Sequence, residues 1–408
     1  MKKILIKNFK NLNNYGSGMM GLVTISKLYN LLDKKVEFYS DLDKYAEYDQ
    51  ILKELNEDII LKVFNDKDKF NKRSNIPVFN KLQTLKRILS NKGAENFDML
   101  IVLGGDDLSE YYGKHVWPLL LSFYSWSYKT KVVLLGQSIG PFNFLPNRLI
   151  FKKLAQRCKI YSRDKFCFDY LKNDLGIKKN ITLSGDLAFL DLPLQKSIEY
   201  QNEILNKFKL TPNSYICIVI SGLFGKYYTS NKEDYFDSFK KLISVIKSNP
   251  ALKDKKICFL AHTFPPHGNE AELLNEFENY INDIDGLVFI KDKIYQGAAR
   301  FILGNGLFTI TGRMHASVST FQMEKPSISL AYSVKYRGVI GENLNQSNLI
   351  IEANNPELWR NKEIVNIISD KINFILNNYD NLVLDIKQNI EQQKTLVNKA
   401  FNDLLKDI

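Results

Sequence analysis

The sequence predicts a two-domain α/β protein in which each domain is built on a parallel sheet. The chain has 408 residues, which is longer than one ordinary core of about 100–200 residues. Short apolar runs alternate with amphipathic stretches along most of this length, the pattern of strands that alternate with helices. Each apolar run ends in a short polar or glycine-rich segment, and ligands of parallel sheets bind at these carboxyl ends of the strands.

The first half of the chain carries the first alternation. A strand at 3–6 is followed by a turn-rich loop at 11–18 and an apolar helix at 19–32. The region 41–92 is charged and is expected to be mostly helical. A near-continuous apolar run such as 97–103 is typical of a strand buried on both faces. Further strands are expected at 35–39, 131–135, 159–161 and 181–183, and helices at 117–128 and after Asp164.

A second alternation begins after the pattern lapses around 191–201, where Pro193 lies in a polar stretch. We therefore predict domains at 1–192 and 193–350, followed by C-terminal helices at 351–408 for which the first domain is the expected packing surface. Strands of the second domain are expected at 215–221, 256–261, 287–289, 307–311 and 326–331, and helices at 235–247, 270–281, 316–322 and 356–408.

This succession of elements is the architecture of GT-B-like enzymes. In that fold class two Rossmann-like parallel-sheet domains face a cleft that holds the ligand, and C-terminal helices follow. The expected number of strands alone also allows a doubly wound fold with an accessory domain.

Composition and hydropathy indicate a globular chain without membrane spans. Apolar residues make up 45% and charged residues 25% of the chain, the proportions of a globular protein. The most apolar segment, 116–128, is interrupted by Pro118 and three serines, and the basic start of the chain precedes an apolar run far too short for a signal peptide. Four scattered cysteines form no CxxC pair, which favours a reducing, cytoplasmic location. We expect no metal and no redox cofactor.

The net charge of +11 is carried almost entirely by lysine, because only nine of the 56 basic residues are arginine. We interpret the excess as thinly spread over a solvated surface. Attraction to anionic lipid or acidic glycan is the alternative, and no nucleic-acid partner is expected. Lysine replaces arginine where only a charge is needed, but not where a planar fork is needed. The arginines are therefore the more informative cations.

The strongest candidate site is the turn Gly312-Arg313-Met314-His315, which joins a buried strand to a helix. A helix start presents free N–H groups and the positive end of the helix dipole, which attract phosphate or carboxylate. Arg313 adds a fork for the same kind of anion, and His315 adds a side chain of the type that exchanges protons near neutral pH. A capping turn whose histidine bonds a backbone carbonyl is the alternative, but an arginine at this place in an arginine-poor chain favours the anion site.

Other cationic and imidazole side chains near strand ends are candidate ligand contacts. Lys335 and Arg337 follow the next strand. We expect them to be second phosphate contacts, and the alternative is that they are ordinary surface cations. Asp164 is suited to cap a helix, but a cation is disfavoured at a helix start, so Arg163 is expected to face an anion or a carboxylate partner. His262 ends another buried strand and is either a ligand contact or a structural residue.

Two polar loops at strand ends of the first domain extend the candidate site. Gly104-Gly105-Asp106-Asp107 allows close approach of the backbone to a ligand. Its acids are suited to bind a metal or to accept protons from hydroxyl groups, with simple capping as the alternative. The side chains of Gln137 and Ser138 are suited to hydrogen-bond a polar ligand. GxGxxG in its proper context and GxxxxGK[ST] are absent from the sequence, so nicotinamide-cofactor and P-loop sites are not expected.

Eight segments at these strand ends follow one another over about residues 11–338. They are NNYGSGMM, GGDDL, GQSIGPF, YSRDKFCFDYL, LSGDLAFL, HTFPPHGNEAE, GRMHASVSTFQMEKPSISLAY and SVKYRG. In this order they resemble the polysaccharide pyruvyltransferase family. The GRMH segment with the following KYRG is the most specific part, and GGDD and GQSIGP are moderately specific.

The resemblance implies a GT-B-like enzyme that moves the enolpyruvyl unit of phosphoenolpyruvate onto two hydroxyls of a glycan sugar, with release of phosphate. By resemblance, Arg313, His315 and Arg163 hold phosphoenolpyruvate. Family members often carry three glycines where this chain has Gly104-Gly105 followed by Asp106, so the loop departs from the family pattern where acceptor contacts are expected. The acceptor is expected to be a glycan or a lipid-linked oligosaccharide, which suits an enzyme peripheral to a membrane.

These residues give a hypothesis for the chemistry. His315 is the acid, Arg313 and Arg163 hold the anion, and Asp106 or Asp107 orients or deprotonates the acceptor hydroxyl. Two alternatives stay open at this point. One is a nucleotide-sugar glycosyltransferase with Arg313 and Lys335 on a diphosphate, and the other is a basic scaffold without enzymatic activity.

Overall fold

The computed structural model describes residues 1–43, 46–64, 89–281 and 284–407, and these residues form two compact units. Much of the region predicted to be mostly helical, 41–92, lies outside the described residues. Its described part contains helix α2 (Tyr48–Leu55) and strand β3 (Ile60–Val63). The apolar pattern of the sequence did not predict β3. This edge strand has only one buried residue, and it therefore lacks the apolar run of a strand buried on both faces.

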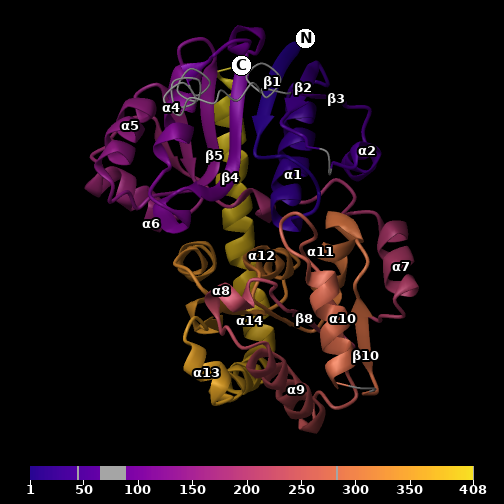
Figure 1. Cartoon of the computed structure of the whole chain (residues 1–408). Coiled ribbons are helices and arrows are strands. Elements are labelled where there is room, and N and C mark those ends of the chain that lie inside the picture. The colour runs from indigo at the N-terminus through magenta and orange to yellow at the C-terminus, as the bar shows by residue number, and fades with distance from the viewer. Residues whose placement is uncertain (44–45, 65–88, 282–283, 408) are drawn as a thin grey trace, which may run out of the picture. The chain divides into compact units, whose positions relative to one another are not determined.

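Unit 1 contains a seven-stranded parallel sheet in the order β3-β2-β1-β4-β5-β6-β7. The two central strands β4 and β5 are almost completely buried along their first halves, and helices flank the sheet (Figure 1). Besides β3, the strands of unit 1 are β1 (Lys2–Lys7), β2 (Val36–Ser40), β4 (Met99–Leu108), β5 (Lys131–Ile139), β6 (Cys158–Ser162) and β7 (Ile181–Leu183). Its further helices are α4 (Trp117–Trp126), α5 (Leu145–Ala155), α6 (Lys165–Asp169) and the π-helix Tyr170–Asp174, with most of α1 (Tyr15–Leu31).

Unit 2 contains a six-stranded parallel sheet in the order β10-β9-β8-β11-β12-β13. The strands are β8 (Tyr215–Val219), β9 (Lys256–Leu260), β10 (Leu287–Ile290), β11 (Thr309–Thr311), β12 (Ser327–Ala331) and β13 (Ile350–Glu352). The helices are α7 (Ile198–Lys207), α8 (Phe224–Tyr227), α9 (Lys232–Ser248), α10 (Glu270–Ile281), α11 (Tyr295–Asn305), α12 (Met314–Gln322), the π-helix Arg337–Glu342, α13 (Pro356–Arg360) and α14 (Glu363–Leu405).

The N-terminal loop differs from the prediction, because α1 begins at Tyr15 and includes Gly16 and Gly18 in its first turn. These glycines do not form the expected turn-rich loop. A Cβ on Gly16 would lie 2.2 Å from Nδ1 of His315, and one on Gly18 would lie 2.1 Å from Nε2 of Gln296. The glycines thus allow close packing of a helix against side chains far along the chain, which local sequence does not reveal.

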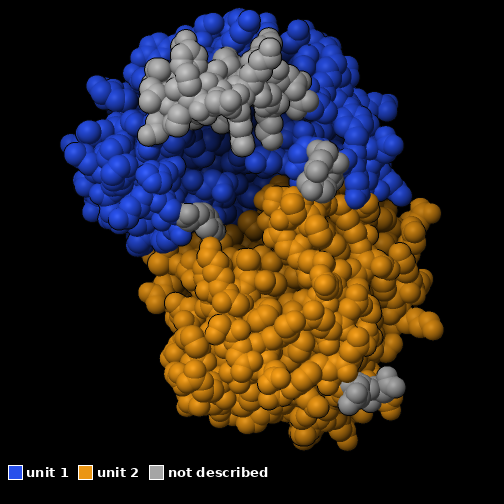
Figure 2. Space-filling model, in the orientation of Figure 1, with its two compact units in different colours: residues 1–11, 20–187, 394–408 blue, residues 12–19, 188–393 orange. Residues whose placement is uncertain are grey.

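The boundaries of the two units differ from those of the predicted ranges 1–192, 193–350 and 351–408. Unit 1 comprises residues 1–11, 20–187 and 394–408, and unit 2 comprises 12–19 and 188–393 (Figure 2). The first turn of α1 therefore belongs to the second unit, as does most of α14. In the part of the chain that the structure describes, no helix is long and apolar enough to cross a membrane.

Candidate active site

Arg313 lies two residues after the end of β11 and occupies the N-cap position of α12, with extended backbone angles. The preceding Gly312 is enclosed, because a Cβ there would lie 2.6 Å from the hydroxyl oxygen of Tyr228. The Tyr336 hydroxyl donates a hydrogen bond of 2.8 Å to the Gly312 carbonyl, and the Tyr228 hydroxyl lies 3.3 Å from the same oxygen. Packed tyrosines therefore fix the backbone of the turn that the sequence singled out.

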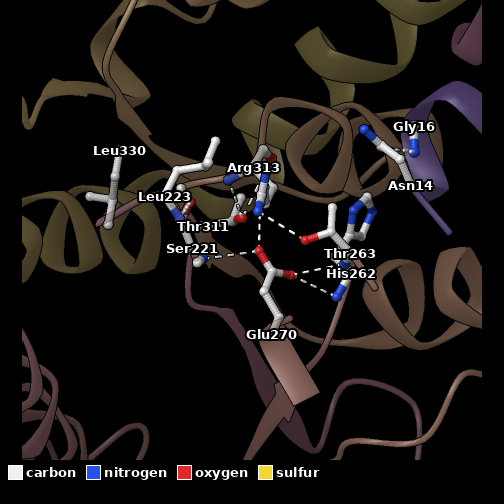
Figure 3. A network of polar contacts seen from close by, with 12 residues as sticks. Asn14, Gly16, Ser221, Leu223, His262, Thr263, Glu270, Thr311, Arg313 and Leu330 are labelled. Carbon is white, nitrogen blue, oxygen red and sulfur yellow. Dashed lines mark hydrogen bonds and ion pairs between the residues drawn. The ribbon is translucent and has the colours of Figure 1, made fainter. Parts of the chain in front are cut away.

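The Arg313 guanidinium is held in place by two side chains (Figure 3). Its Nε donates to Oε1 of Glu270 at 2.5 Å, and its Nη2 donates to Oγ1 of Thr263 at 2.9 Å. Its Nη1 makes no hydrogen bond within the described residues, and 11% of the side chain is exposed. The guanidinium is thus oriented on one side and keeps donors for an external anion on the other.

Glu270, the first residue of α10, is the buried anchor of this arrangement. Its carboxylate is completely buried and also accepts the backbone N–H groups of His262 (2.8 Å), Thr263 (3.0 Å) and Gly222 (3.2 Å). Burial by itself lowers the pKa of Arg313, but the Glu270 carboxylate together with Tyr332 and Tyr336 raises this pKa overall. Arg313 therefore stays charged.

Glu270 was missed by the sequence analysis. An acid at the first position of a helix is an ordinary feature, because it complements the helix dipole. Nothing in the local sequence marks it as the partner of Arg313, which lies 43 residues further along the chain.

His315 lies in the first turn of α12, against the first turn of α1. The absence of a side chain on Gly16 lets the two helix starts approach each other closely. Asn14 precedes α1 and accepts the Gly16 N–H through its side-chain oxygen at 3.2 Å, and it also pairs with Thr263 in an isolated β-bridge. The starts of α1 and α12 thus lie together with His315 and Arg313 within unit 2.

His262 ends β9 and is 1% exposed. Burial lowers its pKa well below 6.5, and the nearby Arg313 and His315 lower it further. Its ring packs edge-on against Tyr15 at 5.2 Å between centroids. Its Nε2 is buried without a hydrogen-bond partner among the described residues. The imidazole is therefore neutral at pH 7 and does not add to the positive charge of the site.

The remaining candidates of unit 2 are Met314, Lys335 and Arg337, which differ in burial and in contacts. Met314 is the first residue of α12, and it is buried with 5% exposure. Lys335 follows β12, with Nζ 3.1 Å from the Tyr332 hydroxyl and 4.9 Å from the centre of its ring. Tyr332 also acts electrostatically on Arg313, which places Lys335 near the turn. Arg337 is 68% exposed and forms an ion pair of 2.8 Å with Glu352.

In unit 1, Arg163 is buried in an ion pair. Its side chain is 1% exposed, and Nη1 lies 3.0 Å from Oδ2 of Asp186, which is completely buried. Its Nε donates to Oγ of Ser138, which in turn donates to Asp164. Asp164 caps α6 by accepting the Cys167 N–H at 2.8 Å. The expected carboxylate partner of Arg163 thus exists, and Ser138 (6% exposed) links it to the helix cap.

Gly104, Gly105, Asp106 and Asp107 lie inside β4, because the strand predicted at 97–103 extends to Leu108 instead of ending in a loop. A Cβ on Gly104 would lie 2.2 Å from the Gly136 carbonyl oxygen, and Gly105 marks a register shift between β4 and β5. Asp107 is exposed and accepts from the Asn8 side chain at 3.5 Å, whereas Asp106 is half-buried and acts electrostatically on Arg163. Gln137 is completely buried and donates to the Leu103 carbonyl, which gives it a structural contact in unit 1.

Two parallel-sheet α/β units followed by C-terminal helices have the architecture of the GT-B-like fold class. Solved structures share this fold. The UDP-GlcNAc 2-epimerase of Neisseria meningitidis, bound to UDP-GlcNAc, aligns with a TM-score of 0.64 and 11% identity over 100% of both chains. Alr3699/HepE of Anabaena, in complex with UDP and glucose, aligns with a TM-score of 0.58 and 11% identity over 100% of both chains. The GT-B-like fold class is confirmed; at this identity nothing beyond the fold follows.

The chain belongs to the polysaccharide pyruvyl transferase family, whose model matches residues 14–334. A curated relative, the amylovoran biosynthesis protein AmsJ of Erwinia amylovora, is 23% identical over 337 residues, which cover 77% of this chain and 74% of the relative. The predicted family is confirmed, and with it a transferase of polysaccharide biosynthesis instead of a scaffold. Lys335 and Arg337 lie just beyond the matched range.

Proposed function

We propose that the enzyme uses phosphoenolpyruvate as donor and transfers its enolpyruvyl unit to two hydroxyls of a glycan sugar as a pyruvate ketal. The observation that carries the proposal is the Arg313 guanidinium, held by Glu270 and Thr263 with Nη1 left for a ligand. His315 stands two residues further on at the same helix start. Phosphoenolpyruvate carries a phosphate and a carboxylate, which suit a guanidinium fork and free helix N–H groups.

The proposed reaction balances with these residues in simple roles. His315 delivers a proton to the methylene carbon of phosphoenolpyruvate, so that C2 becomes an electrophile. One sugar hydroxyl adds to C2 and gives up its proton, which leaves a tetrahedral phosphate ester. The second hydroxyl then forms the other C2–O bond as the C2–O bond to phosphate breaks, and its proton leaves with the phosphate. Arg313 neutralises the charge that develops on the leaving phosphate.

The acceptor side of the proposal rests on the C-terminal end of β4, which contains Asp106 and Asp107. Asp107 is exposed and Asp106 half-buried, so either carboxylate can accept a hydroxyl proton. A glycan acceptor agrees with the family and with a relative named for amylovoran biosynthesis. We also propose that the acceptor is lipid-linked. Arg163 is kept as a proposed phosphoenolpyruvate contact in addition to its ion pair with Asp186.

Titration calorimetry tests the donor. We expect the wild-type chain to bind phosphoenolpyruvate and not UDP- or GDP-sugars. Arg313→Lys should weaken this binding at least about tenfold, because lysine keeps the charge but loses the fork. Arg360→Lys is the matched control, since Arg360 is 64% exposed and pairs with Glu357. Binding of a nucleotide sugar alone would instead establish a glycosyltransferase, the alternative that the same fold allows.

A further inference from the structure

The positive charge of the chain is concentrated in one stretch, contrary to the expectation that it is thinly spread. Residues 111–163 contain nine lysines and arginines and no aspartate or glutamate. This stretch accounts for +9 of the net charge of +11. It runs from the end of β4 through α4, β5 and α5 to the end of β6, so the charge belongs to unit 1.

Six of the nine cations form no ion pair within the described residues. Ion pairs engage Arg163 with Asp186, Lys129 with Glu95, and Lys159 with Asp403 and Asp407. Lys131 donates to the Asp407 carbonyl, Arg148 to the Asp174 carbonyl and Arg157 to Ser127. Besides Lys131, the cations without an ion pair are Lys114, Arg148, Lys152, Lys153 and Arg157. They lie on α5 and at its two ends, because Asn147 of α5 donates to the Lys114 carbonyl and Arg157 follows the helix directly.

The same helix exposes two leucines on one face. Leu145 is 61% and Leu149 is 54% exposed, and residues four apart lie on the same side of a helix. Lys152 and Lys153 continue that side by one turn, while Phe151 and Leu154 face the core. Figure 1 shows α5 at the edge of unit 1. We call the exposed Leu145, Leu149 and Lys153 with the half-buried Lys152, flanked by Arg148 and Arg157, the α5 face.

We infer that the α5 face docks unit 1 on the surface of an anionic membrane. The leucines enter the boundary between headgroups and acyl chains, and the surrounding cations contact lipid phosphates, as in amphipathic helices that lie in a membrane surface. The stretch itself contributes no carboxylate, and Glu110 directly before it acts electrostatically on Lys114 but lies outside the α5 face. This surface is independent of which group the enzyme transfers.

The exposed leucines distinguish a membrane from a soluble polyanion. A charged glycan or a nucleic acid neutralises cations but offers no apolar environment for two leucines. Membrane docking therefore requires both parts of the α5 face, whereas a polyanion requires only the cations.

Sedimentation of the full-length protein with vesicles tests the inference. We expect binding to vesicles that mix phosphatidylglycerol with phosphatidylcholine and little binding to phosphatidylcholine alone. The pair Lys152→Glu with Lys153→Glu should lower the partition coefficient about thirtyfold. The pair Leu145→Ser with Leu149→Ser should lower it about tenfold. Lys152→Gln with Lys153→Gln is a second, milder pair should the reversed charges disturb folding.

Matched variants on unit 2 serve as controls. Ile198→Ser with Leu384→Ser removes residues that are 73% and 65% exposed, and Lys240→Glu with Lys241→Glu reverses two exposed cations of α9. We expect both controls to bind as the wild type does. Equal binding to both vesicle types would overturn the inference, as would a loss in the controls. Wild-type binding by the leucine variants, together with full competition by heparin, would mark a polyanion site and would also overturn it.

Discussion

The turn after β6 in unit 1 and the turn after β11 in unit 2 place an arginine at the same point, between a parallel strand and a helix. Arg163 is 1% exposed, and its partner Asp186 and its contact Ser138 are buried as well. Arg313 is 11% exposed and is bound by Glu270 and Thr263, with Nη1 left over. The same local pattern thus produces a closed ion pair in one unit and an oriented, accessible guanidinium in the other.

The difference teaches that the arginine alone does not make an anion site. What differs is the burial of the guanidinium. Glu270 is completely buried, but the Arg313 side chain that it holds is 11% exposed. The Arg163 side chain is 1% exposed and Asp186 is completely buried, which makes this arginine costly to remove.

The largest expected effect concerns chemistry at the accessible turn. His315→Asn should lower pyruvyl-transfer turnover about 10²–10⁴-fold, the usual contribution of a general acid, while phosphoenolpyruvate binding persists. Single-turnover kinetics with calorimetry measures both. The exposed His115 provides the control His115→Asn, which should leave turnover unchanged. Near-wild-type turnover of His315→Asn would remove this residue from the mechanism.

The next effect concerns stability at the closed turn. Arg163→Met should destabilise the fold by about 3–5 kcal/mol, because it removes the cation of a buried ion pair and leaves the Asp186 charge in the interior without it. The double variant Arg163→Met with Asp186→Leu should recover most of this loss. Urea unfolding measures the free energies of unfolding.

The exposed pair of Arg337 and Glu352 gives the control for that experiment, since Arg337→Met should cost no more than about 1 kcal/mol. Equal losses for Arg163→Met and Arg337→Met would contradict the contrast between a closed and an open arginine. Phosphoenolpyruvate affinity of the stable double variant then tests whether Arg163 also contacts the donor.

A smaller effect is expected where the two helix starts meet. Gly16→Ala should lower turnover about 10²-fold, because the new Cβ displaces the His315 ring and small misplacements of a reacting group are costly. Gly225→Ala is the matched control, since a Cβ at Gly225 meets nothing within 4 Å. Equal activities of the two alanine variants would show that the position of the His315 ring is not critical.

The smallest effect is a pH dependence confined to the unit 2 turn. Burial, Arg313 and His315 hold the pKa of His262 well below 6.5 in the folded state, so below pH 6.5 the unfolded chain binds the extra proton. Stability should therefore fall as the pH drops below about 6.5, by up to about 1.4 kcal/mol per pH unit.

His262→Phe should flatten this dependence, whereas the exposed His115→Phe should leave it unchanged. Thermal unfolding between pH 5 and pH 8 measures both variants. An unchanged slope in His262→Phe would assign the pH dependence to another group.

The order of strands and helices was largely readable from the sequence. Helix α10 has the predicted limits, and β8, β9 and β12 differ from theirs by at most two residues, because apolar periodicity reflects burial directly. The edge strands β3 and β13 were missed. The start of α1 was misjudged, since glycine normally signals a turn and here allows close packing.

By itself the sequence determined the alternation of strands and helices, the placement of Arg313 and His315 at a helix start, and the family. These features depend on residues close together in the chain. Only the tertiary structure decided that Glu270 orients Arg313, that Asp186 encloses Arg163, and that Gly16 lies against His315. Such contacts join residues tens to hundreds of positions apart, and which partners meet is fixed by the packing of strands and helices.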